Sequence, residues 1–544
     1  MNISTALATT ALFRVPSEGL PLPERVRLSY ARAKAIVNAY HLTAEDVLTL
    51  SSKYWEFHSD PVLMMDGSVA TLLTIHYNLC CGTLAMFASG RPEIRGLLED
   101  LLSYRLTGQY CLTEVGHGLD AISLETTATQ MPDGRFLLRT PHDRAAKFMP
   151  PTAPCGIPCV AIVFARLVVN GEDRGIRPFV VRLHDGTTMN EGVICKPLPL
   201  RGGGHPVQHS ITYFHDVPLP QTALLGSEQR SEDPRTEFFY HISRVISGTL
   251  SMGAYGLSAL RIASCIAGRY SLRREVRDTL GRIRRPIASF STQYLPIITA
   301  IAQIKVMEAF SEVSHRRFTT PDASIFDKHL TAALFKITIM SHGLFEFNQL
   351  SVLEVRAAIA EGDVLGISIR FAMDILLGRL NPPATSDGMG ILAKHEQDLI
   401  KQFRDEIPSA DHRAAGIETL LLPHCQQLME AIGHRCAFDA AVELGVDSRI
   451  IDLYVASYVE HEGIPQIKLK RQWTNAATKL YPSLRELVDN LHADAYVTAP
   501  IVTNEGWERF VESLPFAGAP VYKASQSMGD CGAEGSTRTW KALL

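Results

Sequence analysis

Apolar residues recur every three or four positions through the first hundred residues, which is the spacing of packed helices. The run that contains Val62, Met65 and Val69 shows this spacing clearly. Pro92 stands where another helix can begin, because the first turn of a helix does not need the N–H that proline lacks. We therefore predict a helical N-terminal domain over residues 1–109.

After Gln109 the pattern changes to short runs rich in β-branched residues. Cys159–Val169 reads as a strand, Asn170-Gly171 as the turn that follows it, and Pro178–Leu183 as its hairpin partner. The shorter expected elements are a turn at Met131–Gly134, extended runs at Arg135–Thr140 and Ser210–Phe214, and a stretch leaving the sheet at Val217–Gln221. We predict a small antiparallel β-domain over residues 110–228.

Helical spacing resumes near Thr236. We expect long helices over residues 236–266, 291–310 and 326–344, which together form a bundle domain over residues 229–385. Further amphipathic stretches predict a C-terminal helical region over residues 386–516, and a Gly- and Ser-rich tail over 517–544 is expected to be flexible. The predicted fold class is mainly α with an inserted β-domain.

Composition excludes several classes of protein. The net charge of −4 over 544 residues provides no basic field for nucleic acid. No run of about 20 apolar residues is free of charges and breakers, so no membrane span is expected. Ten dispersed cysteines indicate free thiols rather than a disulfide framework. The start carries no signal-peptide pattern, and Lys541–Leu544 is not a Ser-Lys-Leu peroxisomal address, so we expect a cytoplasmic protein.

Chemistry-bearing residues gather between Cys111 and Pro151. Thr113 can donate and accept a hydrogen bond, and Gly116 and Gly118 let the backbone turn sharply or approach a flat ligand. These residues suit a loop that grips a heteroaromatic ring. Taken alone, they are better explained by a capped surface turn.

The motif Thr113-Glu-Val-Gly-His-Gly118 resembles the flavin-binding signature of acyl-CoA oxidases, within the acyl-CoA dehydrogenase superfamily. Similar motifs follow in the family's order: Glu125–Thr129, Ala146-Lys147 with an aromatic residue after it, Arg174–Phe179, Phe214–Pro220 and Ala267–Arg274. The resemblance covers roughly residues 55–375. It implies an N-terminal helical domain, a β-barrel-like middle domain and a C-terminal helical bundle.

The resemblance implies FAD as cofactor, held between the β-domain and the bundle. Its implied cofactor-binding residues are Thr113, Gly118, Lys147, Phe148, Pro151 and Arg274. Thr113 would bond the flavin ring, and the segment from Lys147 would run along its face. Arg274 would reach the FAD phosphates across the interface of a homodimer, a role that suits a guanidinium fork.

Glu361, in the stretch Ala360–Asp363, resembles the family's catalytic base. A desolvated carboxylate there would remove the proton α to a thioester carbonyl while hydride leaves the β-carbon. The implied substrate is an acyl-CoA or related thioester, with oxygen as second substrate and contacts from Leu119, Asp120 and Arg244. A solvated carboxylate at a helix start is the alternative for Glu361.

Several residues depart from the family pattern. Pro151 replaces a glycine, Leu119 replaces a serine, and Met340–Gly343 replaces a glycine-rich stretch. Two alternatives therefore stay open: a monooxygenase or tailoring dehydrogenase that acts on a substrate without CoA, and a non-catalytic binding or scaffold protein. No metal site is expected, because Pro206 spoils the helical spacing of the histidines at 205 and 209.

Overall fold

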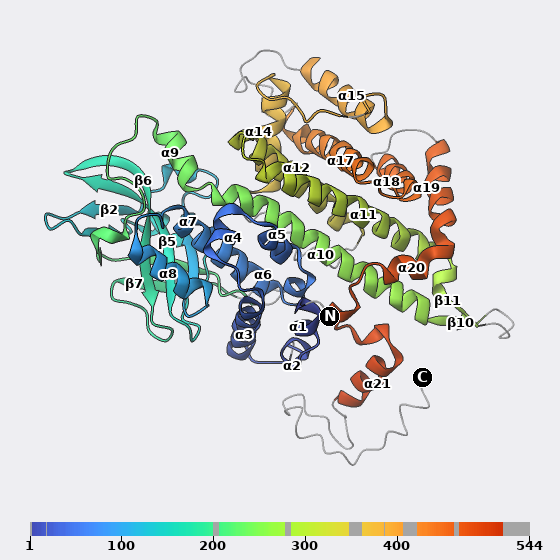
Figure 1. Cartoon of the computed structure of the whole chain (residues 1–544), viewed down its shortest axis with the longest axis horizontal. Helices are drawn as coiled ribbons and strands as arrows, with labels where there is room; N and C mark the ends of the chain where they lie inside the picture. The colour runs from blue at the N-terminus through green and yellow to red at the C-terminus, as the bar shows by residue number, and fades with distance from the viewer. Residues whose placement is uncertain are drawn as a thin grey trace.

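The computed structural model of the chain describes residues 3–17, 19–199, 206–277, 284–346, 362–385, 387–405, 421–461 and 467–514. A β-rich domain lies at one end of the molecule, and helices make up the rest (Figure 1). Along the chain the order is helices, strands, helices. The predicted fold class, mainly α with an inserted β-domain, is confirmed.

The N-terminal domain buries the apolar stripe seen in the sequence. Its helices are α1 (Ile3–Ala8), α2 (Ala11–Arg14), α3 (Leu22–Tyr40), α4 (Ala44–Thr49), α5 (Ser52–Ser59), α6 (Gly67–Leu73), α7 (Gly82–Met86) and α8 (Pro92–Leu102). Pro92 begins α8, as predicted. Between α6 and α7 the chain widens into a π-helix over Thr74–Cys81, a geometry that is frequent at functional sites.

The middle domain has two sheets. Its strands are β1 (Thr107–Cys111), β2 (Thr127–Gln130), β3 (Phe136–Arg139), β4 (Lys147–Phe148), β5 (Cys159–Val169), β6 (Glu172–His184), β7 (Val193–Pro197), β8 (Ser210–Phe214) and β9 (Val217–Leu219). One sheet has the order β1-β5-β2-β3-β9 with β6 also paired to β5, and the other has the order β4-β8-β7. Asn170 and Gly171 both have positive φ, which is the turn geometry that matches strand twist, so the predicted hairpin is confirmed.

Two expectations about this domain are wrong. The sheet is mixed rather than antiparallel, because β1 and β2 both run parallel to β5. The residues from Val217 do not leave the sheet, since they form β9 and pair with β3. Both errors concern strand partners far apart in sequence, which the alternation of apolar residues does not specify.

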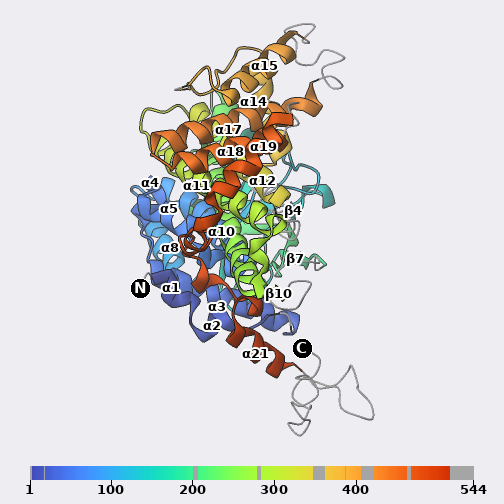
Figure 2. The same cartoon turned by 90° about the vertical axis from the view of Figure 1, so that its right-hand side faces the viewer.

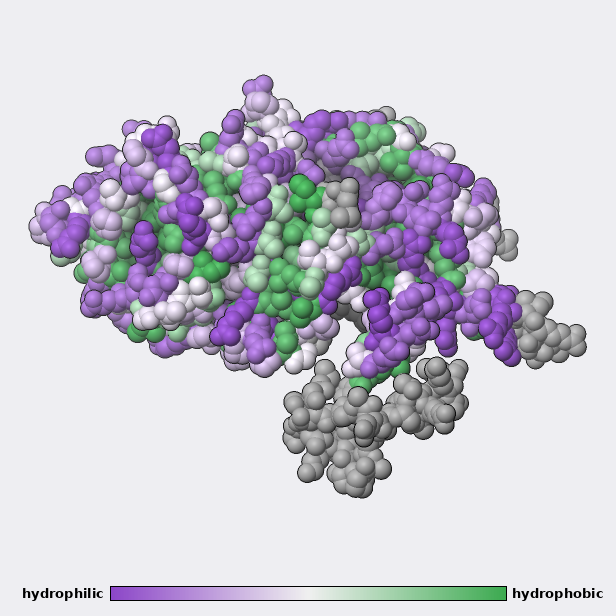
Figure 3. All heavy atoms as spheres, turned by 60° about the horizontal axis from the view of Figure 1, so that its bottom comes forward, coloured by the Kyte–Doolittle hydropathy of each residue, from purple (hydrophilic) through white to green (hydrophobic). Residues whose placement is uncertain are grey.

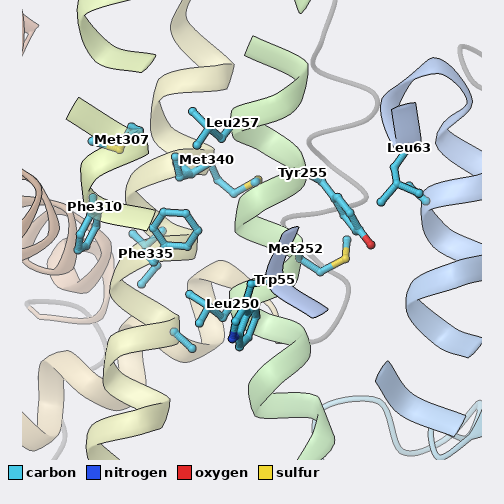
Figure 4. Close-up of a cluster of buried hydrophobic side chains, with 14 of the residues drawn as sticks. Trp55, Leu63, Leu250, Met252, Tyr255, Leu257, Met307, Phe310, Phe335 and Met340 are labelled. Atoms are coloured by element: carbon cyan, nitrogen blue, oxygen red, sulfur yellow. The ribbon is translucent and has the colours of Figure 1, made fainter. Parts of the chain in front are cut away.

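The bundle is built around α10. Its helices are α9 (Pro234–His241), α10 (Arg244–Arg273), α11 (Ser291–Thr319), α12 (Ile325–Glu346) and α14 (Val364–Leu376), and the hairpin of β10 (Glu275–Arg277) and β11 (Arg284–Pro286) follows α10. Gly253 and Gly256 let α10 approach α12 closely. A Cβ at Gly256 would lie 2.5 Å from Cγ2 of Ile339, and one at Gly253 would lie 2.7 Å from the ring of Phe335. Figure 4 shows Phe335 and Met340 among the side chains that fill this contact.

The C-terminal helices cover the outer side of the bundle (Figures 1 and 2). They are α15 (Ile391–Asp405), α17 (Cys425–Glu443), α18 (Ser448–His461), α19 (Ile467–Leu480) and α20 (Leu484–Asp489). The last described helix, α21 (Asn504–Ser513), lies apart from them on the side of the N-terminal helices (Figure 1). The chain then returns to its beginning, where the hydroxyls of Ser4 and Tyr496 lie 2.6 Å apart and Arg14 donates to the carbonyl of Val497. The predicted tail, 517–544, lies outside the described residues.

Two stretches of the described chain are long and apolar enough to cross a membrane, unlike the expectation from sequence. They are Gly67–Met86 and Arg244–Arg273. Most of each apolar window, 83% and 72%, is buried inside the protein. Their apolar surface is therefore used in the core of this fold.

The α10–α12 contact leads to a stability prediction. Gly256→Val should lower the free energy of unfolding by about 1–3 kcal/mol, because the added methyl groups meet Ile339 in a filled core. Gly96→Val, in the exposed part of α8 with no atom within 4 Å of its added Cβ, is the matched control and should change it by less than about 0.5 kcal/mol. Urea unfolding measures both values, and equal effects in the two variants would contradict the tight contact.

Candidate functional site

A buried ion pair joins the loop after β1 to strand β4. The Nζ of Lys147 lies 2.9 Å from Oε1 of Glu114, and neither side chain is exposed to solvent. The Glu114 carboxylate also accepts the backbone N–H groups of Glu125 at 2.7 Å and Thr126 at 2.9 Å. Burial alone would raise the pKa of Glu114, but the charge of Lys147 and these donors lower it below its ordinary value. The carboxylate is therefore ionised at neutral pH.

Backbone hydrogen bonds and a histidine pair fix the rest of this loop. Gly116 donates to the carbonyl of Arg144 at 2.7 Å, and a Cβ at Gly116 would lie 3.1 Å from the side chain of Arg144, so a larger residue there would have to displace Arg144 slightly. The Glu125 carboxylate accepts from His117 at 2.9 Å and from His142 at 3.0 Å, and these bonds keep the pKa of Glu125 below its ordinary value. The loop is thus held by the backbone hydrogen bond of Gly116 and by the side-chain hydrogen bond of His117.

The chain leaves β4 through a constrained turn. Phe148 donates to the carbonyl of Thr113 at 2.9 Å and pairs with Ile211 of β8. The next residue, Met149, has φ +82°, a conformation that costs a non-glycine residue of order 1–3 kcal/mol. The ring of His209 donates to its carbonyl at 2.6 Å and helps to hold it there. Strained backbone of this kind is concentrated at functional sites.

The residues predicted to meet a ligand lie on the open side of this assembly. The Thr113 side chain is partly exposed, and its hydroxyl has no hydrogen-bond partner within the described part of the chain. Gly118 has open space where a Cβ would be. Leu119 is 87% exposed, and the Asp120 side chain is 63% exposed. The loop therefore presents a free hydroxyl and an exposed apolar side chain on a rigid base.

Two residues predicted to bind the cofactor have other environments. The charge of Lys147 is used entirely by Glu114, so only its backbone remains for a flavin. Pro151 is buried, and the following Thr152 bonds the hydroxyl of Thr212 at 2.7 Å. The cofactor contacts predicted for both residues stay predictions.

Arg244, predicted to contact substrate, ties α10 to the N-terminal domain. It is 5% exposed, and its Nε donates to the carbonyl of Asn78 at 3.0 Å. The Asn78 amide donates back to the Arg244 carbonyl at 2.9 Å and accepts from the hydroxyls of Tyr54 and Ser247. A substrate that contacts the Arg244 guanidinium must therefore do so while the guanidinium stays bonded to this network.

The predicted base, Glu361, lies outside the described residues. The two residues after it are anchored between helices. Lys336 of α12, which is fully buried, donates to the Gly362 carbonyl at 2.6 Å. Gly362 has φ +109°, and Asp363 caps α14 by accepting from Gly366. The base role of Glu361 stays a prediction.

Arg274 lies far from the Thr113 loop. It directly follows α10, whose 30 residues span about 45 Å, and the β-domain lies at the opposite end of that helix (Figure 1). Its side chain is exposed and has no ion-pair partner among the residues that the structure places. Within one chain, Thr113 and Arg274 therefore cannot meet at one ligand.

The sequence did not reveal what holds the site together. Glu114 was visible only as a carboxylate within the motif, and His117, Glu125 and His142 were not recognised as a cluster. A conventional metal site is also missing: within the described ranges, no group of three His, Cys, Asp or Glu side chains could hold a metal ion. The sequence did contain one signal for the ion pair, because a lysine inside an apolar strand pattern needs a buried acid as its partner.

No family model matches the chain. It is 26% identical over 335 residues to peroxisomal acyl-coenzyme A oxidase 3 of Homo sapiens, a match that covers 57% of this chain and 46% of that protein. The chain thus spans about half the length of this relative.

Solved structures give the fold over nearly the whole chain. The crystal structure of acyl-CoA oxidase 3 from Yarrowia lipolytica superimposes with a TM-score of 0.76 at 17% identity, covering 94% of this chain and 87% of that one. Acyl-CoA oxidase 2 of Caenorhabditis elegans, bound with FAD, ascaroside-CoA and ATP, gives 0.67 at 15% identity and covers 92% and 93%.

The comparison corrects one expectation. The cytoplasmic location inferred from the sequence is wrong, because the human relative and an Arabidopsis thaliana relative are both named as peroxisomal enzymes. These names point to the peroxisome. The expectation depended on two absent motifs, a signal peptide and a Ser-Lys-Leu ending, and absent motifs do not decide the location of a protein.

The buried ion pair leads to a second stability prediction. Glu114→Gln should lower the free energy of unfolding at pH 7 by about 3–5 kcal/mol, because it leaves the buried ammonium of Lys147 without a counter-charge. The matched control is Glu172→Gln, whose carboxylate is 68% exposed beside Arg174, with an expected loss below about 1 kcal/mol. Equal losses of unfolding free energy in the two variants would contradict a larger contribution from the buried pair.

The same pair predicts a pH dependence. The pKa of Glu114 is lower in the folded protein than in the unfolded chain. The ionised carboxylate therefore contributes its full stabilisation at pH values above the pKa of the unfolded chain, and this stabilisation is lost as the pH falls through the pKa of the folded protein. The difference in unfolding free energy between wild type and Glu114→Gln should therefore be largest at neutral pH and should narrow in acid. Urea titrations at several pH values measure it, and a difference that stays constant into acid would contradict the assignment.

Proposed function

We propose that this chain, which belongs to the acyl-CoA oxidase and dehydrogenase superfamily, is an FAD-dependent oxidoreductase that desaturates an acyl thioester between Cα and Cβ and passes the electrons to oxygen. The observation that carries the proposal is the shared fold, which aligns 94% of the chain with an acyl-CoA oxidase. The rigid Thr113 loop at the predicted cofactor position supports it.

The residues present fit a flavin. The Thr113 hydroxyl is unpartnered within the described chain and can bond a ring heteroatom, and Gly118 in the same loop has open space where a Cβ would be. Clamping by the Glu114–Lys147 pair means that this hydroxyl is positioned before the cofactor arrives. FAD, when bound, supplies the redox chemistry by accepting the hydride from Cβ.

The protein's own part in the reaction is proton removal and positioning. Glu361 takes the α proton, which is only weakly acidic and needs a carboxylate of raised proton affinity. The residue that follows it in the sequence, Gly362, is held between α10 and α12, because Lys336 of α12 donates to its carbonyl and Thr249 of α10 lies 3.4 Å from the position of an added Cβ. Hydrogen peroxide is the product of electron transfer to oxygen.

The working unit in this proposal is a homodimer. Thr113 and Arg274 lie at opposite ends of α10, so both can serve one FAD only if the arginine comes from a second copy. The underside of the molecule also carries a band of hydrophobic residues (Figure 3), and exposed apolar patches of this kind are typical of protein contacts.

A second candidate function is favoured by Leu119. This residue, 87% exposed, occupies the position where the superfamily has a serine near the substrate. An apolar side chain there suits a substrate without the nucleotide part of CoA. Comparing an acyl-CoA with the same acyl group on N-acetylcysteamine distinguishes the two, because only an enzyme specific for CoA reacts much faster with the former.

The central test is flavin reduction. The purified protein should bind FAD and, without air, should bleach on addition of a thioester, then release peroxide in air. Glu361→Gln should keep the flavin spectrum and reduce at least about 100-fold more slowly, since positioned proton transfer contributes factors of that size. Stopped-flow absorbance measures the rates.

The control for this test is Glu443→Gln, an exposed carboxylate on α17 paired with Arg316. It should reduce at the wild-type rate. A protein that takes up no FAD would refute the proposed function altogether, whereas unchanged reduction in Glu361→Gln would refute only the assignment of the base.

A further inference from the structure

The last described helix, α21, has an apolar face that the other described residues leave uncovered. Counting the residue directly after the helix, Trp507, Phe510, Val511 and Leu514 recur at the spacing of a single helix face. No residue of α21 is buried, and Phe510 and Leu514 are 39% and 49% exposed. In Figures 1 and 2 the helix projects from the body of the molecule.

This helix is held mainly at its start. The Thr503 side chain caps it by accepting from the N–H of Gly506 at 2.9 Å, and Arg273 donates to the Asn504 side chain at 2.6 Å. Its main neighbour among the described elements is the turn just before it, Pro500–Val502. A helix of ten residues is marginal in water, because few hydrogen bonds offset the cost of nucleation. Its stability therefore requires a partner for the apolar face.

The polar side of α21 is acidic. It carries Glu505, Glu508 and Glu512 against the single basic residue Arg509. None of the three glutamates has an ion-pair partner in the described part of the chain. The partner of α21 should therefore combine apolar side chains with positive charge. An anionic membrane surface fits poorly, because it attracts basic rather than acidic segments.

The segment Ser536–Leu544, which lies outside the described residues, has this chemistry in its sequence. Trp540, Leu543 and Leu544 follow the i, i+3, i+4 spacing of a helix face, Arg538 and Lys541 are basic, and no acidic side chain is present. We propose that this segment docks on α21 of the same chain, with its apolar residues against the apolar face and its two cations beside the glutamates. The proposal goes beyond the proposed function and does not depend on it.

The linker between the two partners is long enough for this contact. Residues 515–535, which are 21 in number, separate Leu514 from Ser536 and are rich in Gly, Ala and Ser. A flexible linker of that length spans about 25 Å, whereas the ten residues of α21 measure about 15 Å. Tethering gives the segment an effective concentration of about millimolar at α21, so a few weak contacts are sufficient for docking.

The test is hydrogen exchange of α21, followed by mass spectrometry, in the FAD-saturated full-length protein and in a variant that ends at Gly535. Truncation should make the amides of α21 exchange at least about fivefold faster, because the helix loses its partner. The full-length variant Trp540→Ala/Leu543→Ala should exchange like the truncated protein. Because exchange does not require activity, the same comparison decides the proposal even if the protein takes up no FAD.

Charge reversal tests the polar part of the contact. Glu508→Lys/Glu512→Lys should reduce the difference between full-length and truncated protein at least about threefold, since exposed ion pairs contribute effects of that size. Adding Arg538→Glu/Lys541→Glu to this variant should restore the difference. The matched control is Glu99→Lys/Glu191→Lys, which makes the same change of charge at exposed glutamates elsewhere and should leave the difference unchanged.

Four results would overturn the proposal. They are equal exchange of α21 with and without residues 536–544, an equal effect of the Glu99→Lys/Glu191→Lys control, protection that rises with protein concentration, and protection that appears only with anionic vesicles. The third would show that a second copy of the chain covers α21, and the fourth would show that a membrane surface does. Light scattering reports the oligomeric state, and thermal melting confirms that each variant is folded.

Discussion

The loop that carries Thr113 depends on one buried pair of charges. Removing Glu114 and Lys147 from water costs several kcal/mol for each ion, and the cost is offset only because the ions meet at 2.9 Å and the carboxylate has two further donors. A charge pair that must be fully satisfied permits one loop conformation. The strained turn at Met149 and the Thr113 hydroxyl lie next to this pair, because the N–H of Phe148 donates to the carbonyl of Thr113.

A second constraint comes from α10. At its start Arg244 ties the helix to the N-terminal domain through Asn78, and in its middle two glycines allow α12 to pack against it. The position of α10 therefore determines how the π-helix, the bundle and the hairpin beyond Arg273 lie relative to one another. The contacts of Arg244 and of the two glycines thus fix how the N-terminal domain and the bundle pack against each other.

The sequence predicted those parts of the structure that local chemistry determines. The Asn170-Gly171 turn, the helix start at Pro92 and the strand Cys159–Val169 follow from φ preferences and periodicity, and each is present. Parallel pairing of β1 with β5 joins residues about fifty positions apart, and no local pattern encodes that direction. The ion pair had the same limitation. Lys147 was placed at the flavin by family resemblance, and no local pattern joins it to Glu114, its ion-pair partner 33 residues away along the chain.

The contact between the two ends of the chain has a consequence for biosynthesis. Ser4 and Arg14 in the first helices bond Tyr496 and Val497, so the N-terminal domain cannot complete its packing until nearly all of the chain exists. At ribosomal rates of about 5–20 residues per second, that is a wait of roughly 25–100 s. During this interval the first helices expose apolar surface that is later buried. The newly made chain is consequently a candidate for chaperone binding, and its folding is completed by its last helices rather than its first.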